Sequence, residues 1–86
     1  MKVQGAAISL AGQNFAVVLV GMDMVQNPGE ADMAIDSMQP AFGGVPVILM
    51  AQNDKASPTY YGDQGIVALL ADVPVEKMPW KEYTVD

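Results

Sequence analysis

The fold of this chain is decided by residues 45–51, which read VPVILMA. The run is apolar without interruption, and a stretch this short and this rich in β-branched residues is typical of a strand covered on both faces. We therefore predict that residues 45–51 form the central strand of a small sheet, with the other elements arranged around it.

The start of the chain predicts two more strands. Residues 3–10 are small and apolar, and residues 15–20, FAVVLV, are strongly β-forming. Residues 11–14, AGQN, have the composition of a turn, so the three segments together predict a β-hairpin. Its second arm is apolar on both faces, as in an inner strand, whereas the small residues of the first arm leave room for a large group to pack over it.

A helix is predicted between the hairpin and residues 45–51. Asn27 suits the N-cap, Pro28 the first turn, and Glu30 the third helical position. The apolar stripe of this helix consists of Ala31, Ala34, Ile35 and Met38. Pro40 should end the helix, and the glycine pair 43–44 supplies a left-handed stop before the strand.

The second half of the chain predicts one helix and one strand. Residues 52–61 form a polar loop, after which Asp63 can cap a helix that closes before Pro74. The apolar stripe of that helix consists of Ile66, Leu69, Leu70 and Val73. Residues 80–85 predict a final strand, in which Lys81 and Glu82 suit an exposed edge because charge discourages unwanted strand pairing.

The element order is therefore ββαβαβ, and residues 1–86 form a single compact domain. This order predicts an α/β (α+β) fold, a two-layer sandwich with a four-stranded mixed sheet and two helices. The helix between strands 15–20 and 45–51 makes them parallel neighbours if both lie in one sheet. Such an arrangement can leave one apolar sheet face without a helix, which predicts self-association as a homodimer through the sheet face or edge.

Composition excludes several classes of function. Ten acidic residues stand against four lysines and no arginine, giving a net charge of −6, and a phosphate backbone is bound by clustered basic residues. We therefore expect no nucleic-acid binding. Mimicry of a nucleic acid stays open as an alternative, and it requires five acids to line up at phosphate-like spacing: Asp23, Glu30, Asp32, Asp36 and Asp63.

The chain contains neither cysteine nor histidine. This composition excludes the Ser-His and Cys-His nucleophile pairs, thiolate metal sites and disulfides. No phosphate-binding or dinucleotide-binding glycine motif occurs, so we predict no cofactor and no metal. Because these catalytic residue types and cofactor motifs are absent, the sequence favours a non-enzymatic protein. No segment reaches the length of a membrane helix, and we expect a cytoplasmic protein without membrane contact.

A candidate ligand site lies where the parallel strands end. The carboxyl ends of parallel strands share one edge of a sheet, which is where α/β proteins commonly bind ligands. The residues predicted at this edge are Asp23, Gln52, Asn53, Asp54, Tyr60, Tyr61 and Asp63. Asp23 and Asp54 are the only carboxylate pair there that could act as general acid and base.

Two hypotheses about function follow from the sequence. The first is a small interaction or assembly module that acts as a homodimer and can also bind another protein partner. Its candidate interface residues are Trp80 and Tyr83. The second is a binder of a small ligand, or an enzyme, at the carboxyl edge of strands 15–20 and 45–51. A polar pocket at that edge favours the second hypothesis, and an apolar contact between chains favours the first.

Overall fold

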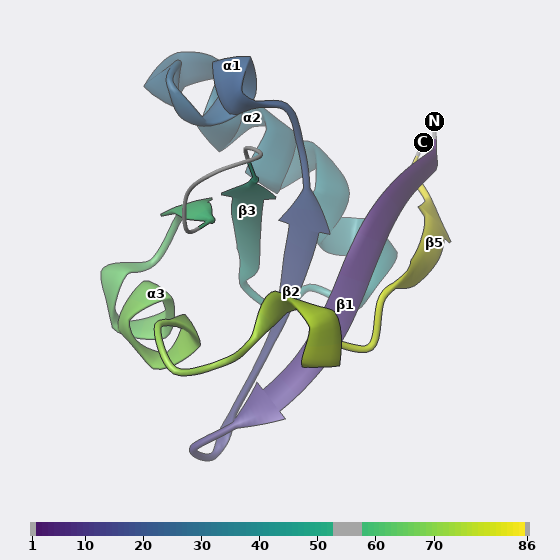
Figure 1. The fold of residues 1–86 in the computed structure, drawn as a ribbon. Coiled ribbons are helices and arrows are strands. Elements are labelled where there is room, and N and C mark those ends of the chain that lie inside the picture. The colour runs from purple at the N-terminus through teal and green to yellow at the C-terminus, as the bar shows by residue number, and fades with distance from the viewer. Residues whose placement is uncertain (1, 53–57, 86) are drawn as a thin grey trace.

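The structure, a computed structural model, describes residues 2–52 and 58–85. Within these residues the sheet has five strands: β1 (Lys2–Leu10), β2 (Gln13–Leu19), β3 (Val47–Ala51), β4 (Thr59–Tyr61) and β5 (Lys81–Thr84). They lie in the order β4-β3-β2-β1-β5 (Figure 1). The pair β2 and β3 is parallel, and the other neighbouring pairs are antiparallel. The predicted α/β (α+β) fold with a mixed sheet is therefore confirmed.

Strand β3 confirms that residues 45–51 contain an inner strand. All of its residues are buried, and it lies between β2 and β4. Ala16 is opposite Val47 in parallel register, and the Ala16 N–H donates to the Pro46 carbonyl at 2.9 Å. The central strand of the sheet is β2 rather than β3, because β3 and β4 lie on one side of β2, and β1 and β5 lie on the other.

The predicted hairpin is present as β1 and β2. Its turn is made by Ala11 and Gly12, both in the left-handed region with φ of 53° and 77°, and Leu10 pairs with Gln13 across it. Two successive left-handed residues match the right-handed twist of the paired strands. This short turn fixes the register along the whole hairpin.

Helix α2 (Pro28–Met38) begins as predicted. The Asn27 side chain accepts a hydrogen bond from the Glu30 N–H at 3.4 Å, and Pro28 opens the first turn. A short helix α1 (Met22–Val25) precedes α2, and a 3-10 turn η1 (Gln39–Phe42) follows it. The glycine pair 43–44 has φ of 76° and 84°, which confirms the left-handed stop before β3.

Helix α3 (Gln64–Leu70) is capped by Asp63, whose Oδ1 accepts from the Ile66 N–H at 3.2 Å. The helix ends before Val73, the last residue of the predicted stripe. Val73 instead packs on the core from the turn that follows, as does the 3-10 turn η2 (Val75–Lys77) through Val75.

Helices cover both faces of the sheet. On the α2 face, side chains such as Val18 and Leu49 pack with residues of α1 and α2. On the α3 face, Val17, Ile48 and Met50 pack with residues of α3 and with the segment around η2. Figure 1 shows α2 behind the sheet and η2 in front of it. The predicted sandwich thus gains a third layer, and the bare apolar face that motivated the homodimer is covered within the chain.

Strand β4 is the strand that the sequence did not predict; residues 59–61 were expected to belong to a loop. It pairs antiparallel with β3, with Tyr61 opposite Leu49 and Thr59 opposite Ala51. Three residues between a proline and a glycine are too few to show the alternation that marks a strand. The element order is therefore ββαββαβ when the short α1 is counted with α2.

Candidate functional site

The structure describes five of the seven residues predicted at the ligand edge: Asp23, Gln52, Tyr60, Tyr61 and Asp63. Asp23 lies in α1, which follows β2, and Gln52 follows β3; both side chains are exposed. Asn53 and Asp54 lie outside the described residues. The pairing of Asp23 with Asp54 as general acid and base therefore stays a prediction.

The Tyr61 side chain is hydrogen-bonded to helix α2. Its hydroxyl donates to Asp32 Oδ1 at 2.8 Å and lies 3.5 Å from the Pro28 carbonyl oxygen. The hydrogen bond to the Asp32 carboxylate raises the pKa of Tyr61 above its ordinary value of 10.0, and burial and the negative charge of Asp32 act in the same direction. This contact joins β4 to the first turns of α2.

Tyr60 points to the opposite face of the sheet. Its ring packs with the residues under α3, and burial raises its pKa from the ordinary 10.0. The hydroxyl oxygen is shielded from water and has no hydrogen-bond partner in the described part of the chain. The two tyrosines therefore do not line a common site, because neighbouring strand residues face opposite sides.

The remaining predicted residues have structural contacts. The Asp63 carboxylate caps α3. Trp80 Nε1 donates to the Val75 carbonyl at 2.9 Å. The Tyr83 ring lies 4.4 Å from the Phe42 ring, centroid to centroid, and Lys81 Nζ lies 5.4 Å from the Tyr83 centroid. Trp80 and Tyr83 thus hold η2 and β5 in place, and their role as interface anchors stays a prediction.

The five acids of the nucleic-acid mimic lie on different sides of the sheet. Asp23 belongs to α1, and the acids Glu30, Asp32 and Asp36 belong to α2, on the α2 face. Asp63 caps α3 on the α3 face. Asp32 is also hydrogen-bonded to Tyr61.

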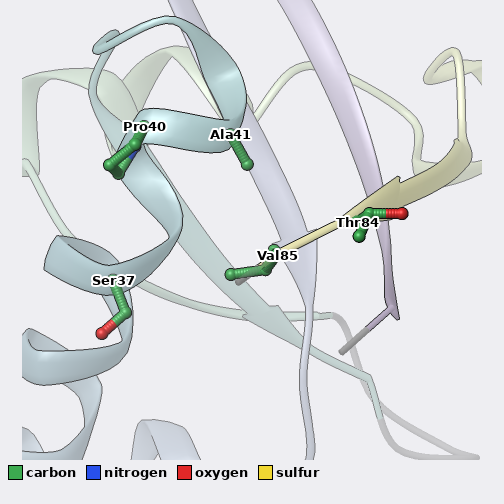
Figure 2. A pocket seen from close by; sticks show the side chains of 5 residues that line it. All are labelled: Ser37, Pro40, Ala41, Thr84 and Val85. Carbon is green, nitrogen blue, oxygen red and sulfur yellow. The ribbon is translucent and has the colours of Figure 1, made fainter.

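Two hollows lie away from the predicted ligand edge. Figure 2 shows the first, of about 370 Å³, between the end of α2, η1 and β5; it is lined by Ser37, Pro40, Ala41, Thr84 and Val85. The second, of about 320 Å³, lies on the α2 face beside the hairpin and is lined by Ala7, Ile8, Ser9, Asn14, Phe15, Phe42 and Val45. None of the predicted site residues that the structure describes lines either hollow.

The described residues contain neither a cluster of metal-ligating side chains nor a helix able to span a membrane. Across residues 2–52 and 58–85, no group of three or more carboxylate side chains is placed to hold a metal ion. Over the same residues, no helix has the length and apolar character needed to cross a membrane.

Among the strands that the structure describes, none pairs with the outer side of the second half of β1, and the sequence did not predict this free edge. Strand β5 pairs with β1 only from Lys2 to Gly5, and β1 continues to Leu10. We call residues 6–10 the open β1 edge. In Figure 1 the arrowhead half of β1 extends past β5 toward the hairpin tip.

The hairpin register identifies which backbone groups point outward from the open β1 edge. Residues that flank a two-residue turn form a hydrogen-bonded pair, and such pairs alternate along antiparallel strands. Leu10 pairs with Gln13 in this way, so Leu10, Ile8 and Ala6 bond to β2. The N–H and C=O groups of Ala7 and Ser9 therefore point away from β2, beyond the end of β5, and both residues are exposed.

The open β1 edge lacks the usual protection of a free strand. Charged side chains and prolines normally keep exposed edges from pairing with other chains. Strand β5 carries Lys81 and Glu82, but no charged residue and no proline occurs between Lys2 and Asp23. The absence of charge and proline in this stretch was the sequence feature that could have indicated an open edge. It indicates one only together with the structural finding that β5 covers no more of β1 than residues 2–5.

Comparison of the chain with models of known protein families, with curated proteins and with solved structures gives no significant match.

Proposed function

We propose that this protein is a non-enzymatic interaction module that binds an extended protein segment along the open β1 edge. The observation that carries the proposal is the outward direction of the Ala7 and Ser9 backbone groups beyond the end of β5. An extended segment that adds to a sheet edge gains affinity from main-chain hydrogen bonds. We place this activity in the cytoplasm, as the sequence favours.

The surroundings of the edge support strand addition. Ala7 and Ser9 have small side chains, so an incoming backbone can approach without displacing bulky groups. The hollow of about 320 Å³ beside them is bordered by Phe42 and Val45. Alternate side chains of an added strand point to the same sheet face, so apolar residues of the bound segment would reach this hollow and supply selectivity.

Amide resonances provide the test. Short extended peptides would be selected by display against the folded protein and then titrated into the isotopically labelled chain. We expect the Ala7 and Ser9 amide signals to shift and their hydrogen exchange to slow, because those N–H groups gain partners on binding.

Two charge variants serve as a matched pair. Ser9→Lys places a charge on the open edge and should abolish the shifts. Gln4→Lys places the same charge on the part of β1 that β5 already covers and should retain them. Peptides that bind without affecting the Ala7 and Ser9 amides would refute the proposal.

A further inference from the structure

We infer that the segment added to the open β1 edge is the same edge of a second copy, paired antiparallel across a two-fold axis. This inference rests on the proposed function, because it uses the same backbone groups. It identifies the partner as this chain and fixes the register of the contact.

The register follows from the outward groups. In an antiparallel pair, two residues directly opposite each other exchange both hydrogen bonds. The outward residues are Ala7 and Ser9, so Ala7 lies opposite the partner's Ser9 and Ser9 opposite the partner's Ala7. Ile8 then lies on the two-fold axis, opposite the partner's Ile8.

The space available on the strand matches this register. Gly5 is the last residue of β1 that β5 covers, and Ala11 is the first residue of the turn. Both are three positions from Ile8 in the sequence. Residues 6–10 of one copy therefore face residues 6–10 of the other, and at each end of the contact β5 of one copy meets the hairpin tip of the other. A window centred on one residue in this way is self-complementary, as an isologous interface requires.

Charge and side chains also fit a second copy. Two chains that each carry a net charge of −6 repel each other, but this contact joins stretches that contain no charged residue. Ile8 is partly buried on the α3 face. Opposed β-branched side chains in a non-hydrogen-bonded pair lie close together and stabilise strand pairing.

The contact is short, so its strength should be limited. Stable protein interfaces bury roughly 1,200–2,000 Å² in total, and one short strand pair lies at or below the low end of this range. We therefore expect a dimer that dissociates on dilution. Light scattering over a concentration series should show the mass rising from one chain toward two.

Cysteine cross-linking tests the register, since the natural chain contains no cysteine. Ala7→Cys, labelled with ¹⁵N, is mixed with unlabelled Ser9→Cys under mild oxidation, and the disulfide-linked products are weighed by mass spectrometry. Directly opposite residues have Cα atoms roughly 5.5 Å apart, which suits a disulfide. Identical residues are diagonal neighbours roughly 7–8 Å apart, which does not. We expect the mixed dimer to form several-fold faster than either homodimer.

Glu82→Cys is the control, because it places an exposed cysteine on β5 and reports random collisions. A mixed dimer that forms no faster than the Glu82→Cys homodimer would overturn the inference.

The outcomes separate this inference from the proposed function. If the protein stays monomeric and cross-links only at the control rate, while peptides still shift the Ala7 and Ser9 amides, the second copy is excluded and the interaction module stands. If peptides leave those amides unchanged and cross-linking stays at the control rate, the proposed function and the inference of a second copy are both refuted.

Discussion

The two sides of the sheet both end in a short strand pairing, β4 with β3 on one side and β5 with β1 on the other, but the contacts at the two sides differ. At β4, Gly62 lies against β3, and the Tyr61 hydroxyl is bound to Asp32 of α2. At the open β1 edge, the Ala7 and Ser9 backbone groups point outward beside small, uncharged side chains. Under the proposed function, the contacts at β4 stabilise the monomer, and the open β1 edge is available for association.

The largest effect on the free energy of unfolding is expected for Gly62→Ala. A Cβ atom on Gly62 would lie 2.6 Å from Ile48 Cδ1 and 3.3 Å from the Val47 carbonyl oxygen, and its φ of 148° disfavours a side chain. Overpacking and backbone strain together predict a loss of about 2–3 kcal/mol, measured by urea denaturation.

Gly12→Ala is the control at the hairpin tip. It has φ of 77° but nothing within 4 Å of the added Cβ, so only the backbone term of about 1 kcal/mol applies. Equal losses in the two variants would show that β3 and Gly62 are not closely packed.

Tyr60→Phe should raise stability. The substitution removes a hydroxyl that is shielded from water and has no hydrogen-bond partner among the described residues. A buried polar group without a partner costs about 1–3 kcal/mol, so its removal should stabilise the fold by roughly 1 kcal/mol. The urea midpoint measures this change, and a destabilised variant would reveal a partner for the hydroxyl.

Alkaline unfolding should distinguish the two neighbouring tyrosines from ordinary ones. The pKa values of Tyr60 and Tyr61 are raised in the folded chain from 10.0. Well below pH 10.0 both hydroxyls keep their protons in the folded and the unfolded chain, so their contribution to stability is fully present. As the pH rises further, the unfolded chain loses protons first and stability falls until the folded hydroxyls ionise.

Tyr61→Phe should therefore flatten the decline of the urea midpoint as the pH rises through 10.0. It should also lower stability slightly at neutral pH, because the exposed hydrogen bond to Asp32 is lost. An unchanged slope in both Tyr60→Phe and Tyr61→Phe would contradict the raised pKa values.

The smallest effect on unfolding is expected for Ser9→Lys. Ser9 is exposed and its backbone groups point outward, so the free energy of unfolding of the monomer should change by no more than about 0.5 kcal/mol. Association should nevertheless be lost in light scattering at concentrations where Gln4→Lys still dimerises. A large loss of monomer stability would mean that the open β1 edge is already occupied within the chain.

Local signals in the sequence predicted the elements that depend on local geometry. Asn27 and Pro28 start α2 by hydrogen bonding and a fixed φ, and the glycine pair 43–44 stops η1 by its left-handed backbone. The parallel pairing of β2 and β3 followed from their apolar runs and the helix between them. These features need no knowledge of distant contacts.

The features that sequence reasoning missed depend on contacts between distant residues. Strand β4 is too short for a periodic signal and forms because β3 offers a free edge. Tyr61 and Asp32 are 29 positions apart. The open β1 edge exists because β5 begins only at Lys81, opposite Gly5, directly after Trp80, whose Nε1 donates to the Val75 carbonyl. No local pattern encodes that length difference between two strands.

The turn of Ala11 and Gly12 has a consequence for how this protein could change over evolutionary time. Because amide direction alternates along a strand, inserting or deleting one residue in the turn would shift β1 by one position against β2. Ala6 and Ile8 would then present their amides to solvent, and Ala7 and Ser9 would turn theirs inward. The same shift would turn every side chain of β1 to the other sheet face and change the pairing of β1 with β5, so the length of this turn sets the outward edge and the packing of the hairpin together.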